Sequence, residues 1–306
     1  MQQYLRKCSL IVADSSGNGL DLSRLRVSFE ITKNDASTPN SASIKVFNLS
    51  DTTANKVRSE FTTVTLSAGY EGSSGVIFDG TIRQTRLGRE NVVDTYIDIS
   101  AADGDQAHNF AYVNTTLAAG ATQATQLNAA IAPMSEYGVT PGYIGPTTED
   151  KLPRGKPMYG LSRKYLRQSS KSANSTWSIQ DRKVNVIPMT GVLPHKVTVL
   201  TPSTGLIGTP EQTEGGIEIK CLINPDLRVG CLVQLPPGVI AEGSTPEPSK
   251  TDTTAPKPLS PLAPDGTYRI LTVGYSGDTR GNDWYANLVC ISADVTAQPG
   301  EEVADV

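Results

Sequence analysis

Strict alternation of apolar and polar side chains is the feature that most constrains the fold of this chain. From residue 25 to residue 32, every second residue is apolar and those between are polar or charged. A period of two places the apolar side chains on one face of a strand, so this segment is predicted to be a half-buried strand. The same period recurs in five further segments, at 4–13, 43–48, 64–70, 76–83 and 93–101. Six short strands predict a small antiparallel barrel or sandwich in residues 1–102.

The pattern changes after residue 103, where strand periodicity stops. Segments 122–134 and 158–172 lack β-branched alternation and are predicted to contain helices. The stretch 137–157 between them holds prolines at 141, 146, 153 and 157, which excludes long regular elements there. A hairpin is predicted at 175–188 around the turn residues Asp181 and Arg182. Residues 103–190 are therefore predicted to form a mixed α+β middle region.

Strand periodicity returns near residue 196 and continues to residue 292, which predicts a second β domain at 191–296. Within it, residues 236–265 hold eight prolines among Ser, Thr, Lys and Glu. Such a composition cannot bury a core, so this Pro-rich loop is predicted to extend between two paired strands. Residues 297–306 form an acidic tail. The expected fold class is mostly β: two small antiparallel β-barrel or sandwich domains flanking the α+β middle region.

The charge and hydropathy of the chain argue against two classes of partner. The chain has 27 basic and 31 acidic residues, a net charge of −4, and no large cluster of Lys and Arg, so the electrostatic footprint of a nucleic-acid-binding protein is missing. No window approaches the roughly 20 apolar residues of a membrane span, and the first residues have no apolar stretch of signal-peptide length. We therefore expect synthesis in a cytoplasm and no membrane anchor.

The candidate metal ligands are few and poorly spaced. The four cysteines at positions 8, 221, 231 and 290 include no CxxC pair, and each lies in or beside a strand-like segment that suits a small buried thiol. Asp103, Gly104 and Asp105 faintly resemble the start of a calcium loop, but the glycine is misplaced and no Glu follows at the bidentate position. A polar turn at the end of the first β domain is the favoured interpretation, and we expect no metal and no cofactor.

The motifs of common hydrolases and phosphate-binding loops, GxSxG, GxxxxGK[ST] and HExxH, do not occur. His108 and His195 lie far apart in sequence without a nucleophile pattern, which favours structural roles for both. Glu149 and Asp150 are adjacent on the Pro-rich middle stretch, whereas a glycosidase needs two acids facing each other across a cleft. We predict no catalytic, cofactor-binding or metal-ligating residues and no enzyme activity.

One short basic run occurs within the second predicted helix. Arg163, Lys164 and Arg167 have helical spacing and are interleaved with apolar residues. Such a run forms either a solvated face or an interface patch, and the solvated face is favoured.

Four segments, taken in order, carry a resemblance to a known family. They are the two-strand segment RVSFEITKNDASTPNSASIKVFNLS at 26–50, the segment 64–82 that runs through an Ala-Gly-Tyr turn to IFDGTI, the segment GIEIKCLINPDLRVGCLVQL at 216–235, and the segment 268–290 with its GDTRGNDW turn. In this order they resemble the hub family of contractile phage tails, related to the hubs of Mu-like phages and of phage-derived tail particles. The Pro-rich loop departs from the family pattern.

The resemblance implies a structural baseplate hub whose two β domains are similar to tail-tube subunits. Three chains would supply six such domains in a homotrimeric ring that adapts the sixfold tail tube to the threefold central spike and lines the DNA channel. The implied partners are the central spike protein and a tail-tube or tube-initiator protein, with tape-measure and baseplate wedge proteins as further candidates. The implied location is the tail baseplate of the virion.

A ring of such subunits implies two further properties, and two other functions stay open for this chain. Open strand edges could pair between neighbouring subunits of a ring, and a mildly acidic channel would let DNA pass without specific binding. A carbohydrate-binding or adhesin module of a phage tail is one alternative, although two Trp and five Phe give no evident platform of exposed aromatics. A spike-associated cell-wall hydrolase is the other, and it lacks a catalytic constellation.

Overall fold

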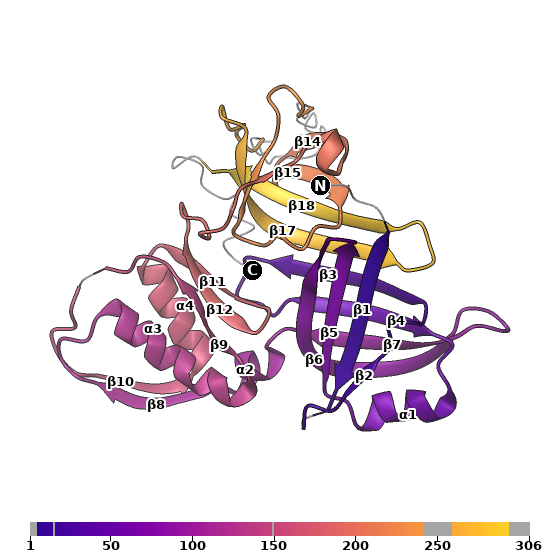
Figure 1. The fold of residues 1–306 in the computed structure, drawn as a ribbon. Helices are drawn as coiled ribbons and strands as arrows, with labels where there is room; N and C mark the ends of the chain where they lie inside the picture. The colour runs from indigo at the N-terminus through magenta and orange to yellow at the C-terminus, as the bar shows by residue number, and fades with distance from the viewer. Residues whose placement is uncertain (1–4, 15, 149, 242–258, 294–306) are drawn as a thin grey trace, which may run out of the picture.

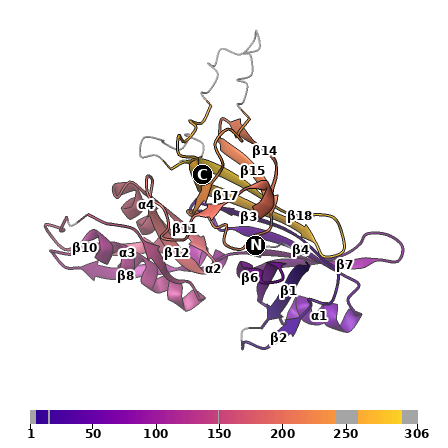
Figure 2. The same ribbon diagram turned by 45° about the horizontal axis from the view of Figure 1, so that its top comes forward.

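The computed structural model describes residues 5–14, 16–148, 150–241 and 259–293, and within them the chain is mostly β, as predicted (Figure 1). A large twisted sheet holds strands from both ends of the chain. A smaller body beside it contains most of the helices (Figure 2). No helix in the described ranges is both long and apolar enough to cross a membrane.

The first hundred residues contribute seven strands and one helix. They are β1 (Arg6–Ala13), β2 (Gly19–Asp21), β3 (Val27–Asn34), β4 (Ser41–Phe47), α1 (Asp51–Ser59), β5 (Thr63–Tyr70), β6 (Ser73–Arg89) and β7 (Thr95–Ala102). All six predicted strands are confirmed, whereas α1 and the short β2 were not predicted. Helix α1 is polar and buries only Ala54 and Val57, so it lacks a strong apolar period. Its start is fixed by Ser50, whose side chain accepts the Thr53 N–H.

The last hundred residues complete the same sheet. They contribute β13 (Thr198–Val199), the 3₁₀ turn η2 (Pro202–Thr204), β14 (Leu206–Thr213), β15 (Gly216–Leu222), β16 (Leu232–Gln234), β17 (Thr267–Asp278) and β18 (Trp284–Ser292). The strand order in the described chain is β14-β15-β18-β17-β3-β4-β7-β6-β5-β1-β2. Antiparallel pairing of β17 with β3, from Thr272 opposite Asn34 to Asp278 opposite Ser28, joins the two sets of strands.

One hydrophobic cluster runs under both sets of strands. It includes Phe29 of β3 and Trp284 of β18, whose rings meet edge to face at 5.6 Å between centroids. Such a pair adds about 0.5–1.5 kcal/mol beyond the area that it buries. The proposed domains 1–102 and 191–296 are therefore joined by backbone hydrogen bonds and by side-chain packing, while their boundaries stay a prediction.

The middle region has a core of its own, built from residues between Ala107 and Val186. Its elements are α2 (Asp105–Phe110), β8 (Tyr112–Leu117), α3 (Gln123–Ile131), the 3₁₀ helix η1 (Ala132–Tyr137), β9 (Thr140–Ile144), β10 (Lys156–Leu161), α4 (Ser162–Ser172), β11 (Ser175–Gln180) and β12 (Lys183–Pro188). Helices α3 and α4 pack together, and α4 packs on β11. Both predicted helices and the predicted hairpin are present.

One helix boundary in the middle region differs from the sequence prediction. The second helix begins at Ser162 and not at Met158, because residues 156–161 pair as β10 with β8. Within its described residues, the Pro-rich stretch 137–157 holds one complete element, the five-residue strand β9, which agrees with the prediction of no long regular element there. Strand β9 lies beside β12 as a parallel edge strand, where the missing N–H of Pro141 is tolerated.

The Pro-rich loop connects β16 to β17, which pair antiparallel. Its described ends are 236–241 and 259–265. Near its end the Ala263 N–H donates to the Tyr268 hydroxyl at 3.1 Å, which fixes the entry into β17. Residues 242–258 and the acidic tail 297–306 lie outside the described residues.

Candidate functional site

The β11–β12 turn is the point where the middle region is fastened to the large sheet. Asp181 and Arg182 have φ angles of 51° and 61°, in the left-handed region. A two-residue hairpin turn needs this conformation, and residues other than glycine adopt it at a cost in conformational free energy. Asp103, which follows β7, accepts the N–H groups of Asp181 and Arg182 at 2.5 and 2.9 Å. Lys33 of β3 pairs with Asp181 at 2.5 Å, and Arg182 pairs with Asp79 of β6 at 2.8 Å.

This turn cluster also sets the protonation of its central carboxyl group. Burial raises the pKa of Asp103 to about 7, although the N–H groups of Arg182 and Asp181 and the charge of Lys33 oppose the rise. The Asp103–Asp105 segment is therefore a structural turn, as the sequence analysis favoured: Asp103 caps the β11–β12 turn and Asp105 begins α2. No group of residues that could hold a metal ion occurs within the described ranges.

A buried ion pair fastens the other end of the same hairpin. Arg269 of β17 and Asp35, just after β3, have side chains only 4% and 2% exposed, and their guanidinium and carboxylate groups are in direct contact. Arg269 also donates to the carbonyls of Pro188 and Met189 at 3.0 and 2.8 Å, and Thr176 of β11 donates to Asp35 at 2.9 Å. Burial raises the pKa of Asp35, and the charge of Arg269 offsets part of that rise.

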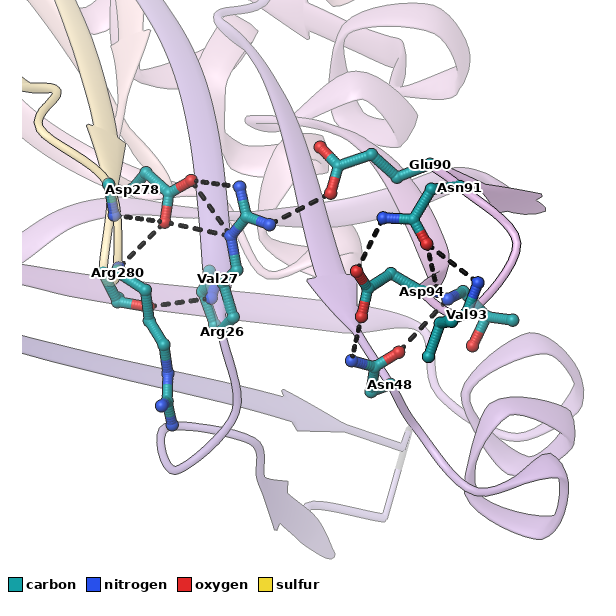
Figure 3. Close-up of polar contacts among 12 residues, drawn as sticks. Arg26, Val27, Asn48, Glu90, Asn91, Val93, Asp94, Asp278 and Arg280 are labelled. Atoms are coloured by element: carbon teal, nitrogen blue, oxygen red, sulfur yellow. Dashed lines mark hydrogen bonds and ion pairs between the residues drawn. The ribbon is translucent and has the colours of Figure 1, made fainter.

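A third polar cluster joins the two ends of the chain at the GDTRGNDW turn (Figure 3). Asp278 accepts the N–H groups of Arg280 and Gly281 at 2.8 and 3.0 Å. Arg26 contacts Asp278 at 2.8 Å and Glu90 at 3.0 Å. Burial raises the pKa of Asp278, but the hydrogen bonds from Arg26 and from the two N–H groups outweigh it and lower the pKa overall. The turn is thereby locked to the strand that begins at Val27.

The loop between β6 and β7 is held rigid from within and presents apolar side chains outward. Asn48 and Asn91 donate to the two carboxylate oxygens of Asp94 at 2.9 and 2.8 Å (Figure 3). The Asn91 side chain accepts the Val93 N–H at 2.8 Å. Val92 and Val93 are 91% and 84% exposed. We call Val92 and Val93 the apolar tip; exposed apolar side chains on an ordered loop suit a contact with another protein surface.

The remaining candidate residues occupy separate places. His108 of α2 stacks on Trp177 at 6.1 Å between ring centroids, and burial lowers its pKa. His195 lines a different cavity, so the two histidines do not meet. Asp150 is exposed, and its neighbour Glu149 lies outside the described residues. The basic run lies on α4, as predicted, and borders an open groove.

The four cysteines are free thiols in strands or beside them. Cys221, Cys231 and Cys290 are buried and Cys8 is half-buried, as expected of small buried thiols. Burial raises the pKa values of Cys8 and Cys221 to about 12, so neither thiol is activated for nucleophilic chemistry near neutral pH.

Comparisons with known proteins connect this architecture to phage tails. No family model matches the sequence, and no curated protein matches it. Among solved structures, the 43 kDa tail protein of prophage MuSo2 from Shewanella oneidensis is similar with a TM-score of 0.59 and 8% identity, over 95% of this chain and 98% of that one. This chain has the fold of that phage tail protein. The match spans both ends of the chain and the middle region.

Two further structures have the same fold. A tail protein from Neisseria meningitidis MC58 gives a TM-score of 0.55 at 8% identity, over 94% of this chain and 96% of that one. An E. coli component of the type VI secretion system, described as structurally similar to the T4 tail proteins gp27 and gp5, gives 0.55 at 9% identity, over 98% and 80%. The resemblance to phage tail proteins is thus confirmed at the level of the fold.

All four segments that carried the resemblance lie in the large sheet. Segment 26–50 contains β3 and β4, segment 64–82 contains β5 and much of β6, segment 216–235 contains β15 and β16, and segment 268–290 contains most of β17 and β18. Sequence analysis did not identify the residues that join the middle region to this sheet. Their contacts span long sequence separations, 78 positions for Asp103 with Asp181 and 234 for Asp35 with Arg269, and no local pattern marks them.

Proposed function

We propose that this chain is a structural, non-catalytic hub in the baseplate of a contractile phage tail. The observation that carries the proposal is the fold similarity to a phage tail protein over nearly the full length of both chains. The polar clusters support it, because their ionised and amide groups cap turns and join elements of the chain to one another. Their arrangement serves to hold strands and the middle region in fixed positions.

The proposed assembly is a homotrimeric ring. Each chain contributes two sets of antiparallel strands to its sheet, so three chains supply six sets and match a sixfold tube to a threefold spike. The strand order ends at β14 and β2, and these edges are the ones proposed to pair between subunits. The apolar tip is the proposed second contact, since assembly would remove Val92 and Val93 from water.

The proposed partners are the central spike protein and a tail-tube or tube-initiator protein, with tape-measure and baseplate wedge proteins also in contact. The ring would line the path of the DNA in the virion tail. A net charge of −4 favours passage of DNA over its retention, because tight binding requires Lys and Arg on the phosphates.

Light scattering of the purified chain tests the assembly, and electron microscopy of tails tests its position. We expect a trimer in solution and density for the chain on the tail axis between tube and spike. A monomer at micromolar concentration together with density away from the axis would contradict the hub assignment. A gel-shift assay should show no retained DNA at physiological salt.

One observation favours the second candidate, a glycan-binding or adhesin role for the middle region. Tyr112 of β8 and Tyr159 of β10 are 43% and 72% exposed and contact each other edge to face at 5.1 Å between centroids. Exposed aromatic rings provide stacking surface for sugars. Retention of the chain on surface glycans of a host, lost in Tyr159→Ala, would favour this role.

A further inference from the structure

An open groove with a cationic wall runs beside helix α4. Its volume is about 740 Å³. Lys164, Arg167 and Lys171 line it and are exposed, Arg163 is half-buried, and the buried Trp177 of β11 also borders it. Arg167 lies four positions after Arg163 and three after Lys164, and Lys171 lies four positions after Arg167, which places the four cations along one side of the helix.

No carboxylate among the described residues neutralises the cationic charge of this groove. In the described part of the protein, no carboxylate pairs with Lys164, Arg167 or Lys171. Arg163 donates to the neutral side chain of Asn109 at 2.9 Å. Like charges three and four positions apart on a helix repel one another, so an anionic occupant of the groove would relieve this repulsion.

The described chain ends beside the same helix. Ala293, one residue after β18, lines a small cavity together with Met189. The Met189 N–H donates to the carbonyl of Asn174 at 3.0 Å, and Asn174 lies two residues beyond the end of α4. Ala293 therefore lies on the side of the molecule where α4 ends, near the Lys171 end of the groove.

We propose that the acidic segment 294–306 of this chain docks into the groove beside α4. The segment contains Asp294, Glu301, Glu302 and Asp305 and no Lys or Arg, so its four carboxylates match the four cations of the wall. Its 13 residues can span about 40 Å when extended, whereas the 11 residues of α4 span about 16 Å. The segment is long enough to pass the whole cationic wall.

The covalent connection makes a modest attraction sufficient. A short tether gives the segment an effective concentration in the millimolar range at the groove, so occupancy does not require tight contacts. Exposed ion pairs of this kind weaken as salt is added. The docking is independent of the hub assignment, because it involves a single chain.

Competition between the tethered segment and a free copy tests the proposal on the full-length chain. The probe is a fluorescently labelled synthetic peptide of residues 294–306, measured by anisotropy at low salt. One variant removes the segment's charge by four substitutions, Asp294→Asn, Glu301→Gln, Glu302→Gln and Asp305→Asn. We expect this neutralised chain to bind the peptide at least about tenfold more tightly than the wild-type chain, whose groove is occupied.

Two charge reversals made in the neutralised chain locate the binding. Lys164→Glu with Arg167→Glu should weaken peptide binding by about tenfold or more, because two attractions become repulsions. Lys56→Glu with Arg58→Glu changes the net charge equally on the exposed face of α1, and should leave binding unchanged. Equal weakening by both pairs would overturn the proposal, as would equal binding to the wild-type and neutralised chains. Binding of a DNA duplex without any binding of the peptide would overturn it in favour of nucleic acid.

Discussion

Replacement of Arg269 by Met tests whether the buried pair with Asp35 stabilises the junction between the large sheet and the middle region. Methionine keeps most of the side-chain length and removes the guanidinium group. The substitution leaves the Asp35 carboxyl with the Thr176 hydroxyl as its remaining described side-chain donor. It also removes the Arg269 donor to the Met189 carbonyl, and it leaves the Pro188 carbonyl with the Gly191 N–H as its described donor.

The expected loss of unfolding free energy is large. Removal of one partner from a buried ion pair costs about 3–5 kcal/mol, and the Met189 carbonyl adds at most about 1 kcal/mol, which water lowers if it reaches the carbonyl. We expect R269M to lose about 4 kcal/mol. The loss should grow as the pH rises above the unfolded pKa of Asp35, about 4, because Arg269 holds down a pKa that burial raises. Without Arg269 the pKa of Asp35 rises further above its unfolded value of about 4, and stability is lost as the pH rises toward that higher value.

Urea unfolding of a double-mutant cycle measures this directly. The matched variant Asp35→Leu with Arg269→Met removes both charges, and should recover at least about 2 kcal/mol relative to R269M. The reasoning is refuted if R269M loses less than about 1 kcal/mol, or if the double variant loses the sum of the two single losses.

Three further predictions follow from other features of the chain. The pKa of Asp103 is raised to about 7, above its unfolded value of about 4, so the stability that Asp103 contributes is complete below about pH 4 and is lost as the pH rises through 7. Asp103→Asn should therefore flatten the dependence of the unfolding free energy on pH between about 4 and 7, measured by urea unfolding. An unchanged dependence on pH would contradict this. Val92→Asp with Val93→Asp should lower the association constant of the trimer at least about tenfold, measured by analytical ultracentrifugation, without lowering the melting temperature. A mass distribution equal to that of the wild-type chain would contradict a contact at the apolar tip. Buried Cys221, whose pKa is raised to about 12, should react with a thiol reagent only after urea unfolding; reaction in the folded chain at neutral pH would show that the thiol is accessible.

Patterns among neighbouring residues predicted the strands and turns that depend on those residues alone. The alternation at 25–32 predicted β3, because one face of that strand packs on the core. The turn residues Asp181 and Arg182 predicted the β11–β12 hairpin. Helix α1 was not predicted because it has no strong apolar stripe. Its clearest local feature is the N-cap Ser50.

Features that depend on distant partners could not be predicted in the same way. Asp103 could be assigned to a turn, but nothing in its neighbourhood indicated that its carboxylate caps a turn 78 positions later. The pairing of β17 with β3 likewise depends on which strand edges remain open after the local hairpins form, and periodicity does not specify this. The four segments of the resemblance predicted the tail-protein fold. The contacts of Asp103 and of Asp35 with Arg269, which join the middle region to the large sheet, form only in the folded chain.

The pairing of β3 with β17 has a consequence for how the protein is made. Arg26 and Asp278, which clamp this seam, are 252 positions apart. While the ribosome synthesises the residues between them, one edge of β3 has no native partner, and slow closure of distant contacts leaves that edge open to aggregation. The seam can close only when the residues up to Asp278 have emerged. A product that stops before β17 therefore lacks the strand that joins the two sets, so the large sheet forms only in chains that extend through β17.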